Sequence, residues 1–218
     1  MTNLTAPVRR GRPVDEPARQ AKLRHILAAA RACFARDGFH RAGTADICRE
    51  AGISPANLYQ YFASKDAIIV AIAEEYRIAD MELLAEFSRA PSFVEGLSAS
   101  SAQLEQSLEE DPHYPRLRLE ILAEATRNPR VAEVVLRAEQ EVRAALAAII
   151  GAARARGEIA TDLPAELLAD IVLSVMDGAS ARQAVTGIRL DTATIDRVFL
   201  KLLLLADPPG LALDGPGS

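Results

Sequence analysis

A short predicted helix over residues 55–62 carries two amides and two phenols on its outer surface. Leu58 and Phe62 lie four residues apart and are expected to face the protein core. Amide groups can read base edges in the major groove of DNA, and hydroxyl groups can reach phosphates. The pattern therefore indicates contact with a nucleic acid. The outward-facing side chains are those of Asn57, Tyr59, Gln60 and Tyr61.

A helix–turn–helix arrangement must position these groups. Its first helix is expected at about residues 44–51, and its turn is Ala51-Gly52-Ile53-Ser54. Gly52 allows a backbone corner with positive φ, and Ser54 is a favourable N-cap for the second helix. Lys65 follows at the start of a long helix, where backbone N–H groups also favour a phosphate.

The remainder of the chain also predicts helices, because alanine and leucine dominate and no sustained alternation with β-branched residues occurs. We therefore expect an all-α protein with about nine helices. Glycine and proline residues mark the expected ends. The predicted helices cover about 18–36, 44–51, 55–62, 65–87, 93–110, 114–128, 130–156, 164–186 and 191–206.

The charge is distributed unevenly along the chain. The 218 residues have a formal net charge of −5, which taken alone argues against nucleic acid. Residues 1–66, however, carry a net charge of +5, and residues 67–218 carry −10. A basic module that can approach phosphate is thus joined to an acidic body.

Several other classes of protein find no support. Two cysteines, Cys33 and Cys48, cannot build a disulfide framework or a four-ligand zinc site, and we expect both to be buried core residues in a reducing cytoplasm. His25, His40 and His113 have no companion ligands at metal spacing, so neither a metal nor a cofactor is predicted. The longest apolar run is about half the ~20 residues of a membrane span, so no membrane partner is expected. No catalytic triad or phosphate loop is evident, and an enzyme is not expected.

The stretch from residue 26 to residue 69 resembles the DNA-binding domain of the TetR family of bacterial transcriptional regulators. The helical pattern of residues 66–206 resembles the ligand-binding and dimerisation domain of that family more weakly. The residues that carry the resemblance are Ile26-Leu27-Ala28-Ala29-Ala30, Phe34, Gly38-Phe39, Asp46-Ile47, Glu50-Ala51-Gly52-Ile53-Ser54, Leu58-Tyr59, Tyr61-Phe62, Ser64-Lys65 and Ile68.

The resemblance implies a homodimeric repressor that binds a palindromic operator in double-stranded DNA and is released by an unidentified small molecule. The two half-sites of the operator would lie about 34 Å apart. It also implies a three-helix helix-turn-helix domain (18–64) and a helical ligand-binding and dimerisation domain (65–206). The proline- and glycine-rich ends of the chain predict a flexible basic arm (1–17) and a disordered tail (207–218). Implied DNA-contacting residues are Thr44, Ser54, Ala56, Asn57, Tyr59, Gln60, Tyr61 and Lys65.

The start of the helix at residue 44 departs from the family pattern. Family members usually carry Thr or Ser where this chain has Ala42 and Gly43. Gly43 can still be the N-cap, with Asp46 three residues later. Alternatively Thr44 caps the helix, which would compete with its phosphate contact.

The N-terminal arm contains Arg10-Gly11-Arg12-Pro13, which resembles the core of an AT-hook. In such a segment Arg10 and Arg12 would enter a narrow A·T-rich minor groove. The alternative is an unstructured basic tail that attracts DNA without sequence preference.

Two further sets of residues are expected in the larger domain. An apolar ligand fits the composition better than a highly charged one. The helix at 164–186 also holds Asp170, Asp177 and Arg182, which would contact a ligand or, as we favour, form an intersubunit or intrahelical polar pair. Expected ligand-lining residues are Tyr76, Met81, Leu84, Phe87, Leu122, Thr126, Met176 and Asp177. The last two helices should form a four-helix dimer interface through Ser174, Gly178, Ala181, Ile195, Val198, Phe199 and Leu202.

Two other functions stay open at this level. The first is a helical small-molecule-binding protein whose DNA-binding head is vestigial. The second is an activator of the same family, because the sequence does not distinguish activation from repression.

Overall fold

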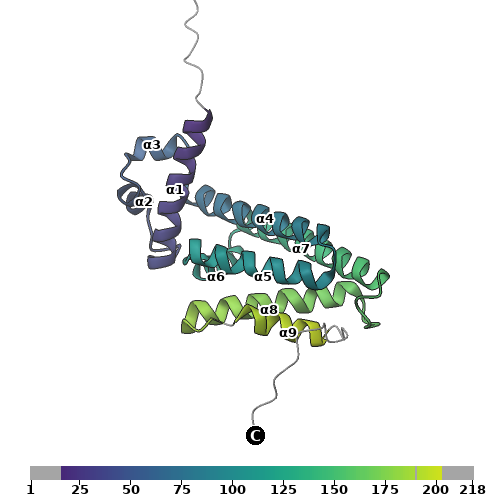
Figure 1. Ribbon diagram of the computed structural model, residues 1–218. Coiled ribbons are helices and arrows are strands. Elements are labelled where there is room, and N and C mark those ends of the chain that lie inside the picture. Colours follow the sequence, from purple (N-terminus) through teal and green to yellow (C-terminus); the bar gives the residue numbers. More distant parts are fainter. Residues whose placement is uncertain (1–15, 190, 203–218) are drawn as a thin grey trace, which may run out of the picture.

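The computed structural model describes residues 16–189 and 191–202. Within them the chain forms nine α-helices and no strand, which confirms the predicted all-α class (Figure 1). The helices are α1 (Glu16–Asp37), α2 (Thr44–Glu50), α3 (Pro55–Tyr59), α4 (Lys65–Arg89), α5 (Phe93–Glu110), α6 (Tyr114–Ala125), α7 (Pro129–Ala155), α8 (Ala165–Thr186) and α9 (Thr192–Leu202).

The head consists of α1, α2 and α3 packed around a small apolar core. Phe34 of α1, Ile47 of α2 and Leu58 of α3 are fully buried in it. Gly52 has φ +59 in the turn between α2 and α3, a conformation that side chains rarely adopt. The Ser54 hydroxyl accepts a hydrogen bond from Asn57 N at 3.2 Å and caps α3. The predicted helix–turn–helix is therefore present.

Helix α3 is shorter than the sequence pattern indicates. It was expected to reach residue 62 but ends at Tyr59, with Gln60 as its C-cap. Helical hydrogen bonding nevertheless continues, because Phe62 N donates to Leu58 O at 3.0 Å. The buried Phe62 side chain closes the head on this side.

The body contains the six helices α4 to α9 and is joined to the head by α4 (Figure 1). Helix α4 packs against α7 and α5, while α8 packs against α6 and α7 and α9 packs against α5. Ile68, Ile69 and Ile72 from the first turns of α4 are buried in the same core as the head residues. That core extends to Leu117 of α6 and Val131 of α7. The head and the body therefore share apolar packing.

Both cysteines lie in the interior of the head, as expected. Cys33 of α1 and Cys48 of α2 are buried and not disulfide-bonded. Burial raises the pKa of the Cys33 thiol, which keeps it protonated and unreactive.

Candidate functional site

The outer surface of α3 presents hydrogen-bonding groups that are only weakly engaged within the protein. Tyr59 is 53% exposed, and its hydroxyl lies 3.4 Å from Thr44 Oγ1. Asn57 Nδ2 donates to Gln60 Oε1 at 3.4 Å, also a long contact. Ala56 is exposed between these groups and leaves room for an approaching groove. Such weak internal contacts can be exchanged for contacts with DNA. Tyr61 is half-buried, with part of its ring against the head core.

Gly43, rather than Thr44, caps α2. Gly43 has an extended backbone (φ −96), and its N–H donates to Asp46 Oδ2 at 2.9 Å. This contact is the largest cause of the lowered pKa of Asp46. Thr44 is thus the first helical residue, and its hydroxyl points toward Tyr59. Because Thr44 does not cap the helix, its hydroxyl is free of that competing role, and its contact with a DNA phosphate stays a prediction.

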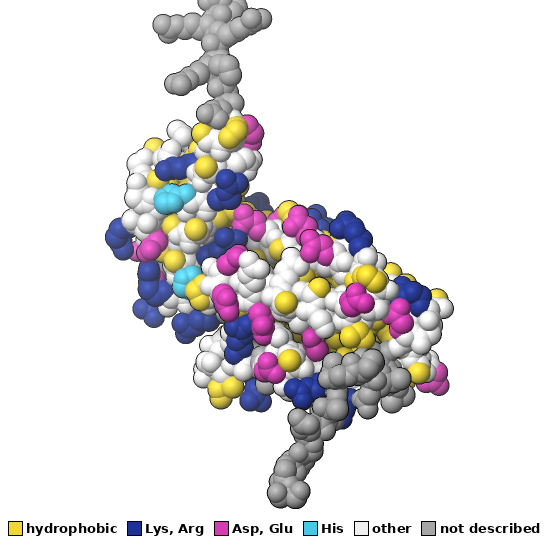
Figure 2. All heavy atoms as spheres, viewed as in Figure 1, with side chains coloured by type: hydrophobic (Ala, Val, Ile, Leu, Met, Phe, Trp, Pro, Cys, Tyr) yellow, Lys and Arg dark blue, Asp and Glu magenta, His cyan; other side chains and the backbone are white. Residues whose placement is uncertain are grey.

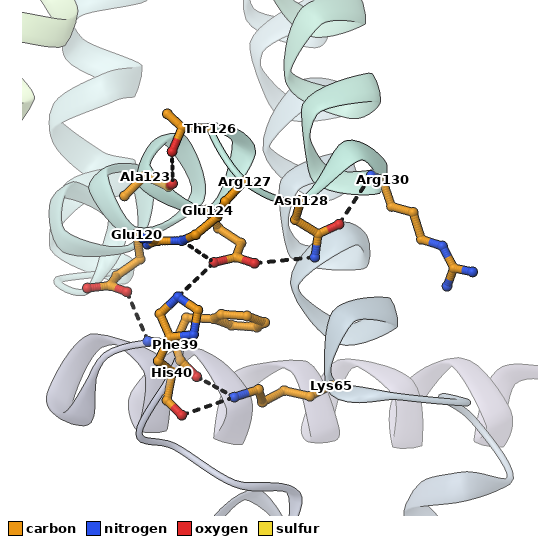
Figure 3. A network of polar contacts seen from close by, with 10 residues as sticks. All are labelled: Phe39, His40, Lys65, Glu120, Ala123, Glu124, Thr126, Arg127, Asn128 and Arg130. Carbon is orange, nitrogen blue, oxygen red and sulfur yellow. Dashed lines mark hydrogen bonds and ion pairs between the residues drawn. The ribbon is translucent and has the colours of Figure 1, made fainter.

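The Lys65 ammonium group is held by the protein itself (Figure 3). Its Nζ donates to Phe39 O at 2.6 Å and to His40 O at 3.3 Å, and it lies 4.4 Å from the centre of the Phe39 ring. These contacts tie the start of α4 to the loop before α2. The phosphate contact implied for Lys65 stays a prediction. In such a contact the phosphate would share the ammonium group with the carbonyl oxygens of Phe39 and His40.

The arm residues Arg10 and Arg12 lie outside the described residues, so their minor-groove role stays a prediction.

A polar junction connects α6 to the loop between α1 and α2 (Figure 3). Glu120 Oε2 accepts a hydrogen bond from Phe39 N at 2.9 Å. Glu124 is only 4% exposed and lies 3.1 Å from His40 Nε2. Arg127 and Asn128 also donate to the Glu124 carboxylate, so its burial is compensated. Sequence reasoning missed this junction because its partners are some 80 residues apart.

A cavity of about 240 Å³ lies among the body helices α4 to α9. Most of its lining is apolar. Of the eight predicted ligand residues, six line it, while Met81 instead lines a second cavity next to Leu84 and Phe87. Thr126 needs correction: it is exposed at the C-terminus of α6, and its hydroxyl donates to Ala123 O at 2.7 Å. The six are Tyr76, Leu84, Phe87, Leu122, Met176 and Asp177.

Charged side chains form part of the cavity wall. Arg118 of α6 pairs with Asp177 of α8 at 2.7 Å, and Glu139 of α7 lies 4.0 Å from the same guanidinium. Asp80 of α4 lines the cavity nearby, and burial raises its pKa to about 6. Burial also raises the pKa of Tyr114 to about 12, so its phenol stays protonated.

Sequence reasoning missed Asp80 and Arg118 as cavity residues, although their spacing carried a signal. Asp80 lies four residues after Tyr76 and four before Leu84, both predicted to line the site. Arg118 lies four residues before Leu122 in the same way. A charged residue at a position that helical spacing places among inward-facing apolar residues predicts a charged group in a cavity wall.

Asp170 and Asp177 of α8 form ion pairs with other helices of the same subunit, which differs from the intersubunit or intrahelical pairs that we favoured. Asp170 pairs with Arg143 of α7, and Asp177 pairs with Arg118. Asp177 also lines the cavity, so its contact with a ligand stays a prediction.

The predicted dimer residues divide into two groups. Ser174, Gly178 and Val198 are exposed and Ala181 is half-buried, all compatible with an interface between subunits. Phe199 needs correction: it is only 5% exposed, because its ring faces inward and lines the cavity. Ile195 is half-buried and lines the cavity too. Leu202 ends α9, and its side chain lies outside the described part of the chain.

In residues 16–189 and 191–202, no group of three or more His, Cys, Asp or Glu side chains could hold a metal ion. His25 Nε2 lies 2.8 Å from Ala51 O and His40 pairs with Glu124, so both have packing roles. Over the same residues, no helix is long and apolar enough to cross a bilayer.

A helix–turn–helix head with a polar recognition surface, joined to a helical body with a cavity, defines a DNA-binding transcriptional regulator. The family description "Bacterial regulatory proteins, tetR family" matches residues 26–72, and "BetI-type transcriptional repressor, C-terminal" matches residues 95–204. The chain belongs to the TetR family of bacterial transcriptional regulators.

Known relatives agree with this assignment. The HTH-type transcriptional regulator UidR of Escherichia coli (strain K12) is 33% identical over 159 residues, which is 72% of this chain and 78% of UidR. The structure of Salmonella enterica GusR is 32% identical with a TM-score of 0.69, covering 88% of this chain and all of that one. FadR of Bacillus subtilis, solved in complex with stearoyl-CoA, is 19% identical with a TM-score of 0.70 over 83% of this chain and 96% of FadR, and supports the fold alone.

Proposed function

We propose that the protein is a homodimeric repressor that binds a palindromic operator and releases it when a small molecule enters the body cavity. The observation that carries this proposal is the position of α6. One side of this helix lines the cavity and another side contacts the loop that leads into the DNA-binding helices.

Helix periodicity explains how α6 serves both regions. Arg118 and Leu122, four residues apart, face the cavity. Glu120 and Glu124, also four apart, reach Phe39 and His40 of the head. Because a helix moves as a rigid element, a ligand that displaces its cavity side must also displace its head side. The head would then lose the orientation that fits DNA.

A second subunit is expected to pack on α8. Its outer side carries residues at alternating steps of four and three, the spacing of a seam between packed helices. Five of these six residues are exposed and one is half-buried in the single subunit, and two are glycine or serine, which let a partner helix approach closely. They are Leu167, Ile171, Ser174, Gly178, Ala181 and Val185.

A two-fold dimer explains why an operator would be palindromic. Each α3 would enter one major groove, and the two grooves lie about one helical turn, ~34 Å, apart. The amides of half-buried Asn57 and exposed Gln60 are suited to base edges, and Thr44 and Tyr61 to phosphates.

The operator itself can be found by selecting genomic fragments on the purified full-length protein. We expect an enriched palindrome whose binding falls steeply with salt. Absence of any enriched palindrome would favour the alternative of a vestigial head. If removing the gene lowers transcription from the bound promoter, the protein is an activator instead.

Coupling between cavity and head can be tested before the effector is identified. Ala138→Trp would place an indole in the cavity and imitate occupancy, because Ala138 lines it. We expect at least a tenfold fall in operator affinity by fluorescence anisotropy. Ala123→Trp, on the exposed side of α6, is the control and should bind normally.

The junction supplies the second arm of that test. In a Glu120→Ala background the effect of Ala138→Trp should shrink, because the hydrogen bond to Phe39 N is gone. An unchanged effect would show that coupling does not pass through Glu120, and normal operator binding by Ala138→Trp itself would contradict ligand control through this cavity.

A further inference from the structure

Among the charged side chains that line the cavity, Asp80 differs from the others. Arg118 pairs with Asp177, and Asp196 accepts a hydrogen bond from Ser101 Oγ at 2.6 Å. Arg77 pairs with two glutamates outside the cavity lining. Within the described part of the chain, Asp80 has neither a hydrogen bond nor an ion pair, although it lines the cavity on α4.

We propose that the cavity binds an amphiphilic organic cation, whose ammonium group pairs with Asp80 and whose apolar part lies along the aliphatic and aromatic lining. This inference rests on the proposed function, in which the cavity is the effector site.

The charge around Asp80 favours a cation. Three carboxylates, those of Asp80, Glu139 and Asp177, lie in the same part of the cavity wall as the guanidinium of Arg118. When all are ionised this region has an excess of two negative charges, and Arg118 is already engaged by Asp177. An anionic ligand would meet repulsion and no free cation there, whereas an ammonium group would supply the missing partner.

The behaviour of Asp80 in the empty cavity is consistent with a missing partner. Burial is the main cause of its raised pKa, and Asp177 and Glu139 add repulsion that Arg118 opposes. A carboxylate held in such a position destabilises the empty protein, and an isosteric amide would remove that cost. Retaining the carboxyl group is therefore expected where it serves a function such as binding a cation.

The rest of the cavity suits an apolar ligand body. Leu84 and Phe87 continue the Asp80 side of α4, and Leu104, Val142 and Leu146 come from α5 and α7. The volume of about 240 Å³ limits the ligand to a small molecule. Ser100 Oγ, also in the lining, is buried and has no hydrogen-bond partner among the described residues, so it offers a second polar contact.

Three probes with one apolar tail and different head groups test the charge preference: octylammonium, octan-1-ol and octanoate. Binding to the full-length protein would be measured by isothermal titration calorimetry at neutral pH. We expect octylammonium to bind at least tenfold more tightly than octan-1-ol and octanoate. No binding of octylammonium, or tighter binding of octanol or octanoate, would overturn the proposal.

Asp80→Asn keeps the side-chain shape and removes the charge. We expect it to lose the tenfold preference for octylammonium over octan-1-ol while its melting temperature is unchanged or higher. Glu82→Gln is the matched control, because Glu82 is exposed on the same helix and does not line the cavity. A preference that survives in Asp80→Asn would show that the cation binds elsewhere.

Operator release separates this proposal from the proposed function. If octylammonium binds through Asp80 but leaves the operator complex intact in fluorescence anisotropy, the ligand class stands and ligand-controlled release fails. If the operator is bound normally and octylammonium does not bind, the cation proposal fails and DNA binding stands.

Discussion

The recognition surface of the head exposes neutral amides and phenols, whereas the cavity of the body is lined by four carboxylates and three guanidinium groups. On the recognition surface the contacts between side chains are long, such as the 3.4 Å between Asn57 Nδ2 and Gln60 Oε1. In the cavity they are tight, such as the 2.7 Å between Arg118 and Asp177. A surface that must exchange its partners for DNA keeps weak internal contacts, while a buried site needs strong ones to hold charges away from water.

The distribution of charge outside these two sites follows the same division. In the view of Figure 2, acidic side chains are spread over the body helices among Lys and Arg, and further Lys and Arg side chains lie along the edge of the head. The net charge is −10 over residues 67–218 and +5 over residues 1–66. The body is therefore repelled by the phosphates that the head attracts, which orients the molecule on DNA.

The largest expected effect comes from separating the two heads. Gly178→Glu places a charge in the centre of the α8 seam, where a Cβ atom meets nothing within 4 Å and the subunit can still fold. We expect a monomer by analytical ultracentrifugation and a loss of more than hundredfold in operator affinity, since one half-site contributes far less than two. Gly151→Glu on α7, whose Cβ position is also open, is the control and should stay dimeric. A dimeric Gly178→Glu protein would show that the interface lies elsewhere.

The next effect is expected at the recognition surface. Asn57→Ala and Tyr59→Ala each remove one polar group from the outer surface of α3, and a good base contact contributes about 1–3 kcal/mol. We therefore expect each variant to lose about tenfold to hundredfold in operator affinity without losing thermal stability. Gln106→Ala removes an exposed amide of α5 and serves as the control. Wild-type binding by both α3 variants would contradict the assigned recognition surface.

The third effect concerns the cavity. We expect Asp80→Asn to stabilise the protein when its cavity is empty. The pKa of Asp80 is raised to about 6 in the folded state, so the folded state binds this proton more tightly than the unfolded state. Stability is thus lost as pH rises from about 4 to about 6. Replacing the carboxyl removes this loss, which is on the order of 3 kcal/mol at pH 7 because each unit of pKa shift corresponds to about 1.4 kcal/mol.

The measurement for Asp80→Asn is urea unfolding between pH 4 and pH 8. The groups that face Asp80 are Arg118 and Tyr114 of α6, Glu139 of α7 and Asp177 of α8. All are shared by both proteins, so the difference in unfolding free energy reports on Asp80 itself. It should be small near pH 4 and full above pH 6. A variant less stable than wild type at pH 7 would show that Asp80 has a stabilising partner.

The two regions also differ in how far the sequence predicts them. The head depends on local rules: Ser54 caps α3 and Gly52 adopts a positive φ as its turn requires. The cavity depends on contacts between distant helices. Nothing local indicates that Arg118 meets Asp177, 59 residues away, or that Phe199 turns inward. The same limit applies to Lys65, whose partners Phe39 and His40 lie on another element.

The smallest expected effect concerns the arm, whose residues Arg10 and Arg12 lie outside the described part of the chain. Removing residues 1–13 takes away three arginines and no acidic residue, so operator binding should weaken by about threefold to tenfold at moderate salt. If the arginines enter the minor groove, the loss should be greatest for operators with A·T-rich flanks, where that groove is narrow and its potential most negative. Anisotropy titrations on otherwise identical A·T-flanked and G·C-flanked operators distinguish the two cases. An equal loss on both would assign the arm a purely electrostatic attraction, and base recognition would then belong to α3.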